Sequence, residues 1–233
     1  MKIFLLVSMF LSLFGSYSDA SDCVILIHGL SRTENSFSKM ERALSDSGYV
    51  VINNSYPSSK HKIETLAEDF ISNSILECSP SEKIHFVTHS LGGILVRQYL
   101  SSNSVDNLGR IVMLAPPNKG SEITDNLKDN FLYKMINGPA GGQLGTDSTS
   151  VPNKLGPAGF ELGVIAGTKS INPILSSMLP NPNDGKVSVE STKLEGMTDH
   201  IEISVSHTFI LRDDDVIDQV THFLKNGEFR HID

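Results

Sequence analysis

The sequence predicts an α/β fold, a three-layer sandwich in which a mostly parallel sheet lies between two layers of helices. Short apolar runs of strand length alternate along the chain with longer segments whose apolar residues recur at helical spacing. Most of the short runs are apolar at successive residues, as in strands buried on both faces of a parallel sheet. The chain shows no internal repeat and no second domain, so the elements are expected to share one sheet.

Six runs are expected to form the strands of this sheet. The first, "CVILI", is apolar at every position, and the fourth, "RIVMLA", is closed by two prolines. The last run alternates Ile201, Ile203 and Val205 with polar residues, which is typical of a strand with one solvated face at a sheet edge. In chain order, the expected strands are 23–29, 49–53, 83–88, 110–115, 161–168 and 200–206.

Helical spacing of apolar residues marks the segments between these strands. The clearest stripe runs from Ile63 to Ile75, and the first helix is expected to end at Gly48. The last helix is expected after Asp213–Asp215, because the helix dipole favours negative charge at an N-terminus. The first helix is expected to begin near Ser36, and two further helices near Leu91 and Ser121, the latter ending near Ile136.

Residues 137–160 are rich in Gly, Pro, Ser and Thr, and this composition predicts a long surface loop. Long ordered loops in compact domains often serve as lids or binding loops.

Residues 1–20 are predicted to be a secretory signal rather than part of the fold. Lys2 precedes an apolar stretch over residues 3–14, and small residues stand at Ser18 and Ala20. The alternative is a membrane anchor, but the apolar stretch is too short to span a bilayer. Cleavage after Ala20 would leave a single domain of residues 21–233, exported to the periplasm or the extracellular medium.

The charge of the chain argues against nucleic acid as a partner. The formal net charge is −8 and the calculated pI is about 5.4. Binding to phosphates requires patches of Lys and Arg, and the sequence has none. The two cysteines, Cys23 and Cys78, lack the close spacing of a metal site, and in an exported protein they are candidates for pairing.

Ser90 lies directly between an expected strand and an expected helix, in "VTHSLGG". A sharp turn there would hold the serine above the sheet in a strained conformation, which requires small neighbours such as Gly92. The sequence therefore predicts a nucleophile elbow, with the N–H of Leu91 directed at the site. Thr88 departs from the usual G-x-S-x-G pattern, and the alternative is a serine that only caps a helix.

The segment "LIHGL" ends the first expected strand and is predicted to form the second half of an oxyanion hole. Gly29 allows the backbone to approach the site closely, so that the N–H of Leu30 is the second candidate donor. His28 is expected to brace this loop as a core histidine rather than to take part in catalysis.

A serine nucleophile needs a base, and the base needs an orienting acid. Of the eight histidines, His207 follows the end of the last strand, at the edge of the sheet where the site is expected. The acid should lie between serine and histidine in the chain, and Asp184 occupies a loop after the fifth strand. Asp-Gly is also a common turn pair, so Asp199 and Glu190 remain alternatives.

The segments "VILIHGL", "VTHSLGG", "MLAPPNKGSE", "NDGKVSVEST" and "SHTFI" together resemble the α/β-hydrolase superfamily, in its bacterial lipase and esterase-like branch. The resemblance implies Ser90 as nucleophile, Asp184 as acid and His207 as base, with no cofactor. Some related lipases hold a structural calcium, but this sequence has no carboxylate cluster for one, so no metal is expected. The large helical caps of many family members are missing from this sequence, so that only residues 117–160 could serve as a lid. The implied substrate is a small-molecule or lipid ester, with transient contact at a membrane or lipid interface.

The resemblance also implies where the two cysteines lie in the fold. In this fold, Cys23 and Cys78 would lie near the amino ends of adjacent strands, which predicts a disulfide that stabilises the fold by roughly 3–4 kcal/mol. Two unpaired thiols are the alternative. For the activity, the alternatives are an acyltransferase, thioesterase or amidase with the same triad, or an inactive hydrolase fold that binds a ligand or a partner.

Overall fold

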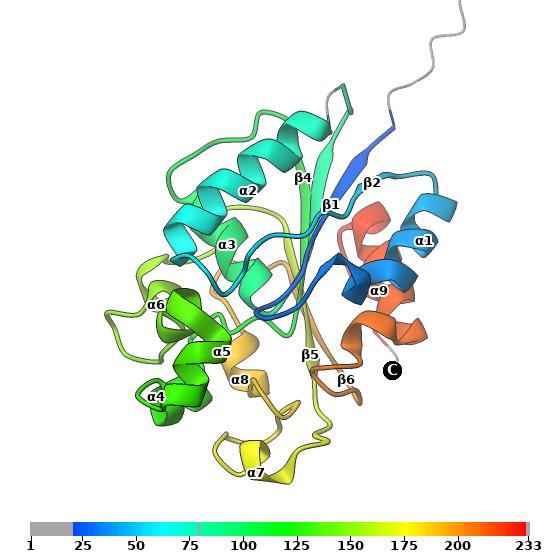
Figure 1. The fold of residues 1–233 in the computed structure, drawn as a ribbon. Coiled ribbons are helices and arrows are strands. Elements are labelled where there is room, and N and C mark those ends of the chain that lie inside the picture. The colour runs from blue at the N-terminus through cyan, green and yellow to red at the C-terminus, as the bar shows by residue number, and fades with distance from the viewer. Residues whose placement is uncertain (1–20, 79, 232–233) are drawn as a thin grey trace, which may run out of the picture.

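The computed structural model describes residues 21–78 and 80–231, so the predicted signal over residues 1–20 lies outside the described part of the chain. Six strands form one sheet in the order β2-β1-β3-β4-β5-β6, and every pair of neighbours is parallel. The sheet separates two layers of helices (Figure 1), which confirms the predicted three-layer α/β fold. The strands are β1 (Cys23–Ile27), β2 (Val50–Ile52), β3 (Ile84–His89), β4 (Leu108–Leu114), β5 (Leu162–Gly167) and β6 (Asp199–Ile203).

The helices divide between the two faces of the sheet (Figure 1). The first and last helices, α1 and α9, cover one face, whereas α2 and α3 cover the other. The α-helices are α1 (Ser38–Asp46), α2 (Ile63–Glu77), α3 (Leu91–Leu100), α4 (Glu122–Leu127), α5 (Phe131–Gly142), α6 (Val151–Lys154), α7 (Pro173–Ser176), α8 (Val189–Thr192) and α9 (Asp214–Asn226). Two 3₁₀ helices, η1 (Glu34–Phe37) and η2 (Ile210–Arg212), precede α1 and α9.

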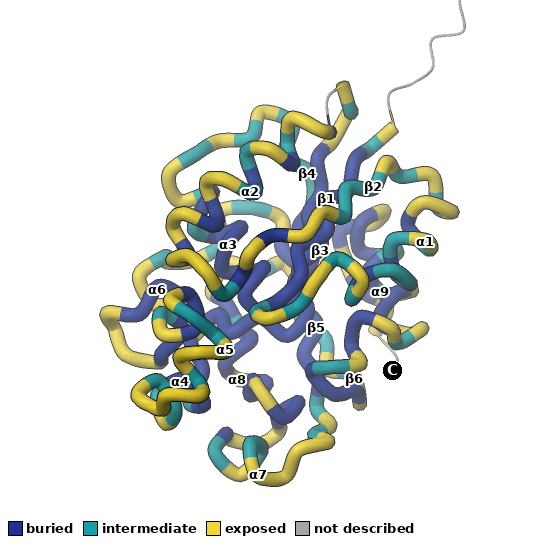
Figure 2. The backbone as a smooth tube through the Cα atoms, viewed as in Figure 1, coloured by how far each residue is buried: buried dark blue, intermediate teal, exposed yellow. Residues whose placement is uncertain are grey.

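The continuous apolar runs are explained by two separate cores. Because side chains alternate along a strand, Ile25 and Ile27 of β1 join the core beneath α2 and α3, and Val24 and Leu26 join the core beneath α1 and α9. Figure 2 shows the central strands buried along most of their length. The strand β6 lies at the sheet edge, as its alternating pattern predicts.

The region 117–160 differs from the expectation. The expected helix over 121–136 is two helices, separated at Asn130, whose side chain accepts the N–H groups of Leu132 and Tyr133 and so caps α5. The expected loop over 137–160 is wrong in its first part, because α5 continues to Gly142. α5 consists of two helical pieces that meet at a kink at Gly138, whose backbone is not helical (φ 59°, ψ −161°), and a side chain there would overlap the Ser59 carbonyl. The short helix α6 lies further along the same segment.

Cys23 and Cys78 form a disulfide, as predicted. It joins the amino end of β1 to the C-terminal end of α2, at the end of the sheet opposite the loops that follow the strands. In the described part of the chain, no helix is long and apolar enough to cross a membrane.

Removal of this disulfide is expected to lower the free energy of unfolding by about 4 kcal/mol, because the bond closes a long loop in the unfolded chain. The cysteines are 55 residues apart. Urea denaturation of the oxidised protein and of Cys23→Ala/Cys78→Ala measures the difference. The double variant is also the control for reductant, which should destabilise only the parent protein. Equal midpoints for the two proteins would contradict the prediction.

Candidate active site

Ser90 lies between β3 and α3 in the strained turn that the sequence predicts. Its backbone has φ 53° and ψ −120°, and its N–H donates to the Leu114 carbonyl at 2.9 Å. A non-glycine residue in this region of the Ramachandran plot is held there by its surroundings. Gly92 is part of these surroundings, because a Cβ on it would overlap the Ile27 carbonyl of β1. Thr88, the departure from the usual pattern, is accommodated wholly buried within β3.

The loops after β5 and β6 bring Asp184 and His207 together. His207 Nδ1 donates to Asp184 Oδ2 at 2.7 Å, and the His207 backbone N–H donates to the Asp184 carbonyl at 3.1 Å. The other carboxylate oxygen, Oδ1, accepts the N–H groups of Lys186 at 2.9 Å and Val187 at 2.8 Å. Both side chains are almost completely buried. The aspartate is therefore fixed on one side by backbone donors and orients the imidazole with the other.

The buried side chain of His89 contacts the backbone of His207. Its Nε2–H donates to the His207 carbonyl at 3.1 Å, and the two rings lie 4.6 Å apart between centroids. Burial, together with the charges of His207, Arg32 and Lys186, lowers the pKa of His89 well below its usual value, so this ring stays neutral. Sequence reasoning placed His89 in the elbow but missed this contact, because the two residues are 118 positions apart.

The loop after β1 lies against the turn at Ser90. A Cβ on Gly29 would come within 3.1 Å of Ser90 Cβ, so only glycine allows this approach. His28 lies beneath the loop, where its Nε2 accepts the N–H of Tyr56 at 3.3 Å and its Nδ1–H donates to the Gly29 carbonyl at 2.9 Å. The His28 ring also stacks on the Tyr56 ring, with 4.2 Å between the ring centroids. Burial lowers the pKa of His28 below its usual value. These contacts suit a brace for the loop.

The backbone N–H groups of Leu30 and Leu91 border this turn. Among residues 21–78 and 80–231, neither N–H has a hydrogen-bond acceptor. Leu91 is the first residue of α3, so its N–H is directed out of the helix, at the positive end of the helix dipole. Two such donors beside one serine can stabilise a negatively charged oxygen.

A cavity of about 230 Å³ opens above Ser90, and both Ser90 and His207 line it. Asp184 lies behind His207 and is not part of the lining. In the described part of the chain, the Ser90 hydroxyl has no hydrogen bond to His207. Hydrogen bonds of this kind are often long before substrate binds.

The alternative acids lie elsewhere. Glu190 is on the surface, paired with Lys119 and Lys193, and Asp199 accepts the Phe229 N–H at 2.8 Å and contacts His231. The structure therefore brings only Asp184 to His207.

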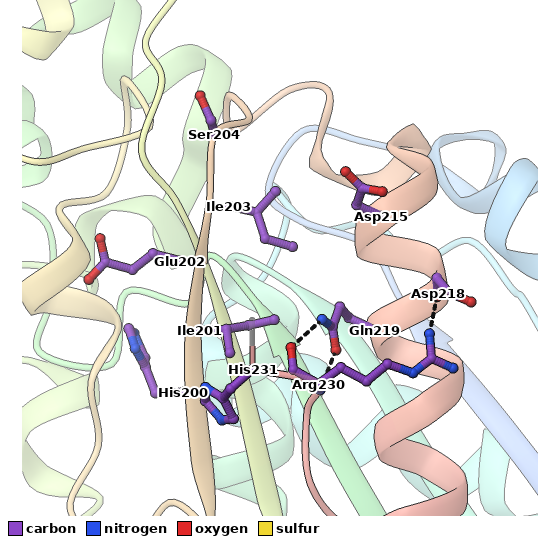
Figure 3. A pocket seen from close by; sticks show the side chains of 10 residues that line it. All are labelled: His200, Ile201, Glu202, Ile203, Ser204, Asp215, Asp218, Gln219, Arg230 and His231. Atoms are coloured by element: carbon purple, nitrogen blue, oxygen red, sulfur yellow. Dashed lines mark hydrogen bonds and ion pairs between the residues drawn. The ribbon is translucent and has the colours of Figure 1, made fainter. Parts of the chain in front are cut away.

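A second cavity, of about 730 Å³, lies between β6 and α9 (Figure 3). Within it, the Arg230 guanidinium pairs with Asp218, and the Gln219 amide bonds to the backbone N–H and carbonyl of Arg230. It contains none of the three candidate catalytic residues. No group of three or more His, Cys, Asp or Glu side chains suited to a metal occurs among the residues that the structure describes.

Comparison with known proteins agrees with this fold. Residues 22–148, more than half of the chain, match the family described as the alpha/beta hydrolase fold. The protein belongs to the α/β-hydrolase family. A search of curated proteins finds no match.

Among solved structures, this α/β hydrolase is similar to the mature lipase BlEst2 of Bacillus licheniformis, with a TM-score of 0.67 and 18% identity over 89% of this chain and 92% of that one. A metagenomic carboxyl esterase has a TM-score of 0.67 and 18% identity, covering 83% of this chain and 66% of the other. Phospholipase PlaB of Legionella pneumophila has a TM-score of 0.62 and 18% identity over 89% of this chain and 64% of its own. At these identities the likeness shows a shared fold.

Proposed function

We propose that this α/β hydrolase is an exported serine ester hydrolase in which Ser90, His207 and Asp184 form the catalytic triad. The observation that carries the proposal is the meeting of three chain segments at one cavity. Ser90 stands on a strained turn, and His207, oriented by a buried carboxylate at 2.7 Å, lines the same cavity. A serine, a base and an orienting acid in this relation constitute the machinery of acyl transfer.

In the proposed reaction, His207 Nε2 takes the hydroxyl proton as Ser90 Oγ forms a bond to the ester carbonyl carbon. The carbonyl oxygen becomes an oxyanion, which accepts the N–H groups of Leu30 and Leu91. The bond to the alcohol oxygen then breaks, and the proton on His207 passes to the departing alcohol. Water repeats the sequence on the acyl-enzyme, releasing a carboxylic acid and restoring the serine. Asp184 stays ionised and stabilises the imidazolium that forms twice in the cycle.

The surface near the cavity favours a substrate ester that has an apolar group. Six large apolar side chains that are more than half exposed lie on α5 and around α7, the elements that supply Ile136 and Leu175 to the cavity lining: Phe131, Leu132, Met135, Ile136, Ile171 and Ile174. Exposed apolar side chains beside a cavity are common at lipid and ligand binding sites. A lipid ester, with brief contact of this face with a lipid surface, is therefore the favoured substrate class. The disulfide agrees with export to an oxidising compartment.

The proposal predicts that a fluorophosphonate probe labels the protein at Ser90 and that Ser90→Ala abolishes both labelling and hydrolysis of p-nitrophenyl esters from acetate to palmitate. Ser101→Ala is the matched control, because Ser101 lies exposed at the other end of the same helix. This variant should retain labelling and turnover. Mass spectrometry of the labelled protein identifies the modified residue.

The outcomes separate the alternatives. Hydrolysis that is equal in the parent protein and Ser90→Ala would overturn the proposal. Labelling without ester hydrolysis would favour a thioesterase, amidase or acyltransferase, and product analysis with alcohol acceptors would identify transfer. Absence of labelling would favour an inactive fold that binds a ligand.

A further inference from the structure

Two cations that form no ion pair with the described residues border the candidate active site. Arg32 follows the loop after β1 and Lys186 follows Asp184, and both line the cavity that contains Ser90. They are the only charged side chains among the described residues that line it, apart from the histidines. Arg32 Nη2 donates to the Thr208 hydroxyl at 3.4 Å, a long and neutral contact.

Neither cation has an acidic partner at ion-pair distance among the residues that the structure describes. Other cations form ion pairs, for example Lys119 with Glu190 and Arg110 with Glu161. Arg32 and Lys186 form none with any carboxylate in the part of the chain that the structure describes, although the protein carries a net charge of −8. Desolvation and, after it, repulsion from Arg32 lower the pKa of Lys186, against a smaller opposing effect of the Asp184 carboxylate.

The lining of the cavity combines apolar side chains with the two cations. The segment from α4 to the end of α5 and its flanks supplies a mostly apolar wall: Pro117, Ile123, Leu127, Tyr133, Ile136 and Leu144. The two cations come from other loops, beside the loop of Leu30 and the loop of Asp184. Ser90 and His207 belong to the same lining. A ligand complementary to both the apolar side chains and the two cations must carry an apolar portion and an anionic group.

Building on the proposed esterase function, we propose that the substrate is an amphiphilic ester with a carboxylate or phosphate group, which Arg32 and Lys186 bind while its apolar portion lies on the wall formed by α4 and α5. A guanidinium and an ammonium suit these anions, the first through paired donors and the second as a point charge. A neutral ester fills the apolar wall but leaves both cations unpaired. The two residues would therefore determine specificity.

Calorimetric titration of Ser90→Ala protein tests the inference without depending on turnover. The probes are octyl phosphate, octanoate and octanol, each below its aggregation concentration, so that the anions differ from the neutral compound mainly in charge. We expect at least one anion to bind about tenfold or more tightly than octanol. Added Arg32→Gln/Lys186→Gln substitutions should remove this advantage, with little change for octanol, and salt should weaken only the anion.

The matched control is Arg42→Gln/Lys225→Gln in the same background, which removes two exposed positive charges on α1 and α9. It should retain the preference for the anion. A preference for octyl phosphate would indicate a phospholipid-type headgroup, whereas a preference for octanoate would indicate an ester of a dicarboxylic acid. Equal binding of octanol and both anions, or a preference that survives Arg32→Gln/Lys186→Gln, would overturn the inference. Neither result depends on whether Ser90 is catalytic.

Discussion

Asp184→Asn is expected to lower kcat for ester hydrolysis by a factor of about 10⁴ while leaving the protein folded. The geometry of the loop gives the reason. Asp184 Oδ1 accepts two backbone N–H groups, those of Lys186 and Val187, at 2.9 and 2.8 Å. In the variant, the amide oxygen must take this position, since an NH₂ group there would face two donors. The amide NH₂ group then faces His207.

The tautomer of His207 follows from that orientation. Nδ1 of His207, which donates to the carboxylate at 2.7 Å, would have to accept from the asparagine amide instead. The ring proton would move to Nε2, the nitrogen that has to take the proton of Ser90. The base would be blocked, although every residue kept its position. The expected signature is a loss in kcat with a nearly unchanged KM for a short-chain ester.

Glu190→Gln is the control, because it makes the same change of carboxylate to amide at an exposed ion pair. It should alter kcat by no more than about twofold, as expected for a surface substitution. Circular dichroism and thermal unfolding establish that both variants fold. A Glu190→Gln variant that is as impaired as Asp184→Asn, or an Asp184→Asn variant with normal turnover, would show that the acid is wrongly assigned.

The fold could be predicted from the sequence because its signals are local. A strand buried on both faces favours an unbroken apolar run, and β1 and β5 each have one. The turn at Ser90 could be predicted for the same reason, since a strand, a serine and two glycines within a few residues leave few other structures. The order of the triad along the chain then limited the choices for the acid and the base.

What could not be predicted depends on contacts between distant segments. The composition of 137–160 is typical of a loop, yet Gly138 is where the chain passes the Ser59 carbonyl and α5 continues beyond it. The contact between His89 and the His207 backbone joins β3 to the loop after β6. Arg32 and Lys186 are 154 positions apart, and nothing in the sequence indicates that they share a cavity.

The same limitation applies to Arg97, whose role is visible only in the folded chain. This residue of α3 is 5% exposed, and it forms no ion pair with a carboxylate among the described residues. Its Nη1 donates to the Asn118 carbonyl at 3.0 Å, and its Nη2 donates to the carbonyls of Pro152 and Gly156, both at 2.9 Å. Burial lowers the pKa of Arg97 to about 10, so the guanidinium stays charged at neutral pH.

Arg97→Leu is therefore expected to lower the free energy of unfolding by about 3–5 kcal/mol, because buried carbonyl oxygens would lose their donors. Arg97→Lys should recover only part of this loss, since an ammonium cannot reproduce the two-sided fork of the guanidinium. Urea denaturation measures both values, and Arg42→Leu, at an exposed position on α1, is the control and should change stability by less than about 0.5 kcal/mol.

Substitution of Arg97 should also affect substrate binding, because Arg97 links α3, the helix that follows Ser90, to both ends of the segment 118–156. This segment includes most of the apolar wall of the cavity. If the guanidinium holds that wall in place, Arg97→Lys should raise KM for a long-chain ester more than for acetate, while kcat changes little. A uniform loss of kcat for every chain length would instead indicate that Arg97 acts through α3 and the position of Ser90.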